Sequence, residues 1–186
     1  MRVSVYGSAE EEREEVMRLA YRLGEVIAGR GHTLITGACG GVPLEAVKGA
    51  HTKGGGIIGY SPARNLEEHR NWGMPEEGHT DLVFVPKTYE HAGHPLICRK
   101  YRNISSVAAC DAAIFIAGKV GTLNEFTIAY DLGRLIGVLT GSGGVTDLLN
   151  SIVEALRKEP RPCMVFSSDP LEILSKFEKY ALQTPS

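Results

Sequence analysis

The sequence predicts a Rossmann-like, three-layer α/β/α fold with a mainly parallel sheet. From Val3 to Phe166, short apolar runs alternate with segments whose apolar residues recur at helical spacing. Many of the 22 glycines fall at predicted strand ends, which is typical of tight strand-to-helix turns. A chain of 186 residues suits one hydrophobic core. We therefore expect a single domain over residues 1–186, with residues 181–186 as a frayed tail.

The composition is that of an ordinary globular protein, with 43% hydrophobic and 23% charged residues. The formal net charge of −2 provides no basic field, so we expect no nucleic-acid partner. No apolar run approaches membrane-spanning length and no signal-peptide pattern opens the chain, so we expect no membrane association. Cys39, Cys98, Cys110 and Cys163 form no CxxC pair, which favours reduced thiols and a cytoplasmic location.

The alternation of strands and helices implies right-handed crossovers and therefore parallel strands. Strands are expected at Val3–Tyr6, His32–Thr36, Gly55–Tyr60, Asp81–Pro86, Ala112–Ala117, Leu135–Thr140 and Cys163–Phe166. Helices are expected from a Ser8 cap to Gly29 and at Leu44–Thr52, Leu96–Ala109, Phe126–Leu135, Val145–Arg157 and Pro170–Tyr180.

Two connections are long and polar. Ser61–His79 is either a functional lid or a mobile surface loop. Lys87–Pro95 contains His91 and His94, but no third ligand of suitable type adjoins them, so no metal site is expected. No cofactor is expected either. The first glycine turn is not GxGxxG, and the second strand lacks the acidic residue that binds the ribose of NAD.

The turn from Gly118 to Thr122 is interpreted as the anion-binding centre. It joins a buried strand to a helix, whose first backbone N–H groups and positive dipole end point back at the turn. Gly118 and Gly121 lack a Cβ and let a phosphate approach closely, while Thr122 offers a hydroxyl and Lys119 a charge. The alternative is structural: Thr122 and Glu125 have the spacing of a capping box.

Other residues are expected at the same edge of the sheet. Arg99, Arg102 and Asn103 share one face of the helix that feeds the Ala112–Ala117 strand, although a solvated surface is the commoner fate of arginines. Gly7 and Ser8 end the first strand and are followed by three glutamates, which would repel a phosphate. We expect Gly7 and Ser8 to touch a neutral part of a ligand.

Three stretches together resemble one family. Gly118-x-x-Gly121-Thr122-x-x-Glu125 resembles the Pro-Gly-Gly-x-Gly-Thr-x-x-Glu signature of the "Lonely guy" (LOG) proteins of the SLOG superfamily. Arg102-Asn103 matches the arginine-bearing helix upstream of that signature. The glycine turns of the family are matched by Gly7-Ser8 and by Gly37, Gly40 and Gly41. The resemblance covers about residues 1–160 and is closer to the branch of DprA and the molybdenum-cofactor carrier proteins.

The resemblance implies a nucleotide-binding domain that hydrolyses the N-glycosidic bond of a nucleoside 5′-monophosphate or acts on a related phosphorylated small molecule. In that reading the Gly118–Thr122 turn holds the phosphate, and Arg102 and Glu125 are catalytic. The family also implies a homo-oligomer, a dimer or higher. Its older label, lysine decarboxylase-like, has little support, because nothing marks a lysine for a Schiff base.

The sequence departs from the signature at two positions. Ala117 replaces the proline and Lys119 replaces the second glycine. The Lys119 side chain either crowds the ligand or supplies an ammonium contact to its phosphate. A second function therefore stays open, that of a carrier which holds a nucleotide or a phosphorylated, molybdenum-cofactor-like molecule without turnover.

Overall fold

The computed structural model describes residues 1–156 and 162–183. Over these residues the strands form one seven-stranded sheet in the order β4-β3-β2-β1-β5-β6-β7, and every neighbouring pair is parallel. The strands are β1 (Arg2–Gly7), β2 (Thr33–Thr36), β3 (Ile57–Tyr60), β4 (Asp81–Val83), β5 (Ala112–Ile116), β6 (Leu135–Leu139) and β7 (Met164–Ser167). The Rossmann-like fold with a parallel sheet is confirmed.

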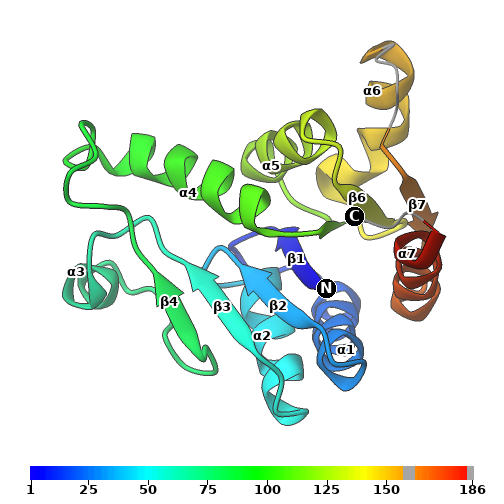
Figure 1. The fold of residues 1–186 in the computed structure, drawn as a ribbon, viewed down its shortest axis with the longest axis horizontal. Coiled ribbons are helices and arrows are strands. Elements are labelled where there is room, and N and C mark those ends of the chain that lie inside the picture. Colours follow the sequence, from blue (N-terminus) through cyan, green and yellow to red (C-terminus); the bar gives the residue numbers. More distant parts are fainter. Residues whose placement is uncertain (157–161, 184–186) are drawn as a thin grey trace.

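Helices cover both faces of the sheet, which gives the three expected layers (Figure 1). One face carries α1 (Glu14–Gly29), α2 (Val42–Thr52) and α7 (Pro170–Gln183). The other carries α4 (Pro95–Ala109), α5 (Val120–Asp131) and α6 (Leu149–Leu156), which the 3-10 helix η1 (Gly144–Leu148) precedes. The short helix α3 (Leu66–Asn71) lies beside the β4 edge (Figure 1).

The central strands are buried on both sides, which explains their continuous apolar sequence. All five residues of β5 are buried. Ile114 packs with α1, α2 and α7, whereas Phe115 packs with α5 and α6. The strand order reverses between β1 and β5, and the helices that follow these two strands lie on opposite faces. In such sheets a crevice opens at the carboxyl ends of the two strands.

The first helix begins later than the capping pattern predicts. Ser8 does not cap α1; its hydroxyl accepts the Glu10 N–H at 3.3 Å within a local turn. The helix starts at Glu14, and its N-cap residue Arg13 makes no side-chain capping bond. The glutamates after Ser8 therefore lie in the loop that follows β1, which leaves the Glu10 side chain available to other elements.

The Ser61–His79 segment, predicted to be irregular, contains the helix α3 and is held by side-chain hydrogen bonds. Asn65 caps α3 by accepting the Glu68 N–H at 2.9 Å. His69 is fully buried, with Nδ1 2.9 Å from the Ser61 hydroxyl and Nε2 3.1 Å from the Pro75 carbonyl oxygen. His69 therefore connects α3 to the residues before and after the helix. A buried imidazole with both nitrogens hydrogen-bonded is explained by this structural role, without a lid function.

Three predicted helices also need correction. The helix predicted from Phe126 starts six residues earlier, at Val120, and ends at Asp131. The helix predicted from Val145 is split into η1 and α6, and its predicted last residue, Arg157, lies outside the described residues. At the carboxyl end α7 continues to Gln183, so residues 181–183 are helical rather than frayed, and residues 184–186 lie outside the described part.

Candidate functional site

A pocket of about 450 Å³ lies where the sheet order reverses. We call it the switch-point pocket. It is lined by the end of β1 and the loop after it, by the turn after β2 and the start of α2, by the first half of α4 and by the start of α5. The lining residues are Tyr6, Gly7, Ser8, Ala9, Glu10, Gly37, Cys39, Pro43, Leu96, Arg99, Lys100, Arg102, Asn103, Lys119, Val120, Gly121, Thr122 and Glu125.

The start of α5 opens into this pocket. The first backbone hydrogen bond of the helix runs from the Leu123 N–H to the Lys119 oxygen at 3.0 Å, so the preceding amides have no acceptor within the helix. Gly118 has φ +86°, and a Cβ there would collide with the Thr122 side chain. At Gly121 a Cβ would meet nothing within 4 Å, so this residue leaves open space beside the unpaired amides.

Two alanines near the pocket have left-handed backbone. Ala38 (φ 47°) and Ala117 (φ 49°) are the non-glycine residues with positive φ over the described ranges. Such conformations cost about 1–2 kcal/mol and gather at functional sites. The Ala117 N–H donates to Ser142 Oγ at 2.8 Å. A proline could neither adopt this φ nor donate this bond, so the departure from the LOG signature reflects a different turn geometry.

Arg102 spans the pocket from α4 to the turn after β2. Its guanidinium donates to the Gly37 carbonyl oxygen and, through Nε, to Asn103 Oδ1 at 3.1 Å. Asn103 is buried and donates in turn to Asn124 Oδ1 at 2.9 Å. A Cβ at Gly37 would collide with the guanidinium, so the close approach of Arg102 requires that glycine. Asn103 therefore positions the arginine.

Glu125 lies on the pocket wall in the second turn of α5. It is only 6% exposed, and burial raises the pKa of its carboxyl from the ordinary 4.5 to about 7, against the opposing charges of Arg102 and Lys100. The predicted capping box is absent: the N-cap residue is Lys119, which makes no side-chain capping bond. The alternative prediction, that Glu125 serves only as the acid of a capping box, is therefore wrong.

Glu10 and Lys119 form an ion pair at the mouth of the pocket. Lys119 Nζ lies 2.6 Å from Glu10 Oε2, and both side chains are largely exposed. The hydrogen bond and charge of Lys119 lower the pKa of Glu10, and Glu10 raises the pKa of Lys119. The ammonium that the sequence suggested for phosphate is thus engaged by a carboxylate from the loop after β1.

The structure brings most of the predicted site residues together. Gly40, Gly41 and Gly118 are not among the lining residues. Gly41 has φ +65°, and a Cβ there would collide with the Ser8 and Glu10 carbonyl oxygens, so its role is to seat the loop after β1 against α2. No residue of the Ser61–His79 segment lines the pocket.

Sequence reasoning missed several wall residues, among them Tyr6, Cys39 and Lys100. Burial raises the pKa of Tyr6, whose hydroxyl donates to Ser106 Oγ at 3.0 Å. Burial likewise raises the pKa of the Cys39 thiol. The signal that could have found these three residues is their position in the sequence, because each lies within two positions of a predicted site residue.

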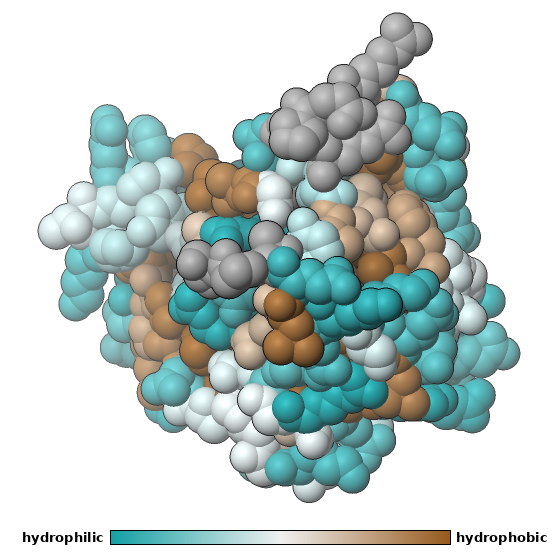
Figure 2. Space-filling model, turned by 45° about the vertical axis from the view of Figure 1, so that its right-hand side comes forward, coloured by the Kyte–Doolittle hydropathy of each residue, from teal (hydrophilic) through white to brown (hydrophobic). Residues whose placement is uncertain are grey.

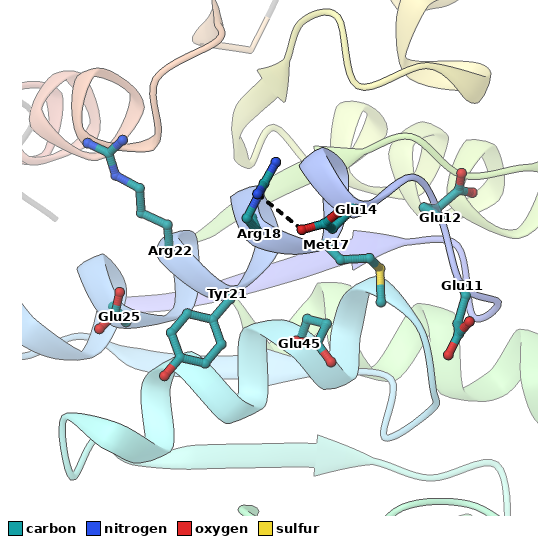
Figure 3. Close-up of a pocket in the computed structure, with 9 residues that line it drawn as sticks. All are labelled: Glu11, Glu12, Glu14, Met17, Arg18, Tyr21, Arg22, Glu25 and Glu45. Atoms are coloured by element: carbon teal, nitrogen blue, oxygen red, sulfur yellow. Dashed lines mark hydrogen bonds and ion pairs between the residues drawn. The ribbon is translucent and has the colours of Figure 1, made fainter.

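A larger groove lies between α1 and α2 (Figure 3), but its charge is wrong for a phosphate. It has a volume of about 720 Å³ and is lined by five glutamates and two arginines. Arg18 within it pairs with Glu14 at 3.1 Å. Over residues 1–156 and 162–183, no three metal-ligating side chains gather, and no helix is long and apolar enough to span a membrane.

Fold and site together define a class: a Rossmann-like protein with a pocket at the switch point of its parallel sheet, the place where such sheets commonly bind ligands. Residues 1–174 match the SLOG cluster4 family, and the chain belongs to this family. The resemblance to the SLOG superfamily is therefore confirmed.

Three known proteins illustrate the relationship. The chain is 34% identical over 139 residues to an uncharacterized protein of Archaeoglobus fulgidus, covering 75% of this chain and 80% of that protein. Its structure is similar to the molybdenum cofactor binding protein of Rippkaea orientalis (TM-score 0.72, 23% identity, 97% of this chain and 96% of that chain). It is also similar to DNA processing protein A of Helicobacter pylori, described in a single-stranded DNA binding mode (TM-score 0.67, 16% identity, 97% and 81%). The two solved structures carry the names of the branch that the sequence motifs predicted, and at 23% and 16% identity they show a shared fold.

Proposed function

We propose that the switch-point pocket binds a nucleoside 5′-monophosphate or a related phosphorylated small molecule, with its phosphate at the Lys119–Thr122 turn. The observation that carries this proposal is the start of α5, where unpaired amides and Gly121 open into a pocket whose α4 wall carries cationic side chains. Gly118 does not line the pocket but allows the turn to form, because it has a positive φ and packs against the Thr122 side chain.

We further propose that the protein hydrolyses the N-glycosidic bond of this nucleotide. The bond between ribose C1′ and the base nitrogen breaks, water supplies a hydroxyl to C1′, and the base takes a proton. Positive charge develops at C1′, which the Glu125 carboxylate stabilises. A pKa of about 7 suits Glu125 to accept a proton from water near neutral pH. Arg102, on the facing wall, assists the leaving base.

The second candidate function is a carrier that binds without turnover. Two contacts favour it: Lys119 is paired with Glu10, and Arg102 donates to the Gly37 carbonyl oxygen instead of to Glu125. The similarity to a molybdenum cofactor binding protein supports the same alternative. DNA processing protein A shares the fold, but with a net charge of −2 we retain a small molecule as the ligand.

The two functions are separated by incubating the protein with a panel of nucleoside monophosphates and measuring free base by chromatography. We expect base release by the wild type and by Glu11→Gln, a matched control outside the pocket. Glu125→Gln should bind the nucleotide without releasing base. Binding without release by the wild type would support the carrier function, and absence of binding would reject both functions for nucleoside monophosphates.

The phosphate position has its own test in Gly121→Ala. The new methyl group would meet no neighbour within 4 Å and replaces a helical glycine, so the fold should be retained or slightly stabilised. Because the methyl group fills space beside the unpaired amides, we expect weaker nucleotide binding by calorimetry. An unchanged affinity would place the phosphate elsewhere.

We also propose that residues 1–186 form one domain and that the protein is a cytoplasmic homo-oligomer. The face of α5 that carries Phe126 and Tyr130 is buried in the protein's own core and cannot form the interface. The described surface nevertheless exposes Ile104 of α4, Val120 of α5 and Leu132, the residue directly after α5. The face in Figure 2 likewise shows hydrophobic patches among hydrophilic side chains. Light scattering that finds a monomer at micromolar concentration would contradict this proposal.

A further inference from the structure

We propose that the ligand carries a second phosphate, which Arg99 and Lys100 on the α4 wall bind. This inference rests on the proposed function, since it assumes that the first phosphate lies at the start of α5. It changes the preferred ligand class from a nucleoside monophosphate to a nucleoside diphosphate or bisphosphate.

The argument starts from the cations that are already engaged. Four cationic side chains line the switch-point pocket. Lys119 is paired with Glu10 at 2.6 Å. Arg102 is held by the Gly37 carbonyl oxygen and by Asn103. These two cations have partners within the protein and are the less available to a ligand.

Arg99 and Lys100 are different. Both are exposed, and among residues 1–156 and 162–183 neither makes an ion pair or a hydrogen bond through its side chain. Their charges nevertheless act on the pocket interior: burial raises the pKa values of Cys39 and Glu125, and the charges of Arg99 and Lys100, respectively, oppose that rise. The uncompensated positive charge of the pocket is therefore on α4 rather than on the Lys119–Thr122 turn.

A single phosphate at the start of α5 does not neutralise the positive charge of Arg99 and Lys100. Arg99 and Lys100 both line the switch-point pocket, and an anion at this wall offsets the repulsion between their like charges. An arginine donates in a fork that matches phosphate oxygens, and a lysine adds a point charge. Leu96, one turn earlier on α4, is 73% exposed at the same wall and can pack against an apolar part of such a ligand.

The test compares nucleoside 5′-monophosphates with the matching 5′-diphosphates and 3′,5′-bisphosphates, for each common base, by calorimetry at constant ionic strength. For the wild type we expect the second phosphate to tighten binding about tenfold, as a charge-assisted contact does. The position of that phosphate, on the 5′ or the 3′ side, follows from which of the two series shows the gain.

The variants are the double substitution Arg99→Gln with Lys100→Gln and the control Lys87→Gln. Lys87 is an exposed lysine outside the pocket, so its replacement measures the effect of removing a positive charge elsewhere on the protein. The double variant should reduce the affinity ratio towards one, and the control should keep it. If monophosphates bind but a second phosphate adds nothing, or the double variant keeps the ratio, the inference is wrong while the proposed function stands. If no monophosphate binds, the proposed function fails and this inference with it.

Discussion

Replacing Glu125 by Gln is predicted to stabilise the protein at alkaline pH, because the fold holds this carboxyl in an environment that disfavours its charge. Burial raises its pKa from 4.5 to about 7. The folded state therefore keeps a proton that the unfolded chain has already lost. The stability associated with this group is fully present below about pH 4.5 and is lost as the pH rises to about 7. The loss is about 3 kcal/mol, a large part of a typical unfolding free energy.

Glutamine keeps the shape of the protonated carboxyl and does not ionise. The variant should therefore match the wild type near pH 4.5 and exceed its unfolding free energy by about 3 kcal/mol at pH 8, as measured by urea unfolding across this range. The control is Glu68→Gln. A hydrogen bond from Arg64 lowers the pKa of Glu68, so its replacement should destabilise the protein at pH 8.

The difference between Glu125→Gln and the wild type isolates this group from every other titration. A difference that stays constant from pH 4.5 to 8 would refute the reasoning, because an unperturbed or fully solvated carboxyl would behave in that way. A difference that falls with rising pH would mean that the Arg102 charge outweighs burial and lowers the pKa of Glu125.

Three further changes test the turn and its neighbours. Glu10→Gln frees Lys119 and should tighten phosphate binding a few-fold in calorimetry; weaker binding would contradict a competing role for Glu10. Gly118→Ala places a side chain at φ +86° and should lower the melting temperature by roughly 2–8 °C, so an unchanged midpoint would argue against the described turn. Asn103→Ala removes the partner of Arg102 Nε and should weaken nucleotide binding roughly five-fold, whereas an unaffected Kd would show that the arginine needs no support.

The fold was predictable because each buried element carries its own pattern. The β5 run is apolar throughout, as a strand covered on both faces must be. The periodicity of α1 indicated its buried face, and the glycines marked the turns between layers. The periodicity of α4 was misleading: Ile97 and Ile104 are exposed, whereas Cys98, Asn103, Ser106 and Val107 are buried. Helix starts were less predictable. Ser8 has the residue type of a cap and Thr122 the spacing of a capping box, yet local turn geometry leaves both without that role.

The site was predictable at positions where a glycine lets another group approach the backbone closely. Gly37 and Gly121 are examples, since one faces a guanidinium and the other the open pocket. The pairing of Glu10 with Lys119 was not predictable, because it joins loops 109 positions apart. Nor was the burial of Glu125, which raises its pKa and depends on how α4 packs against α5.

Ser142 shows how far the definition of this site extends along the chain. Its hydroxyl accepts the Ala117 N–H 25 residues upstream and donates to the Leu139 carbonyl oxygen at 2.6 Å. The shape of the turn thus depends on a residue outside the stretch by which such turns are recognised. A motif search would score a Ser142→Ala variant as intact, although its turn would have lost its anchor. Transplanting the turn into another scaffold would likewise require moving this distant serine with it.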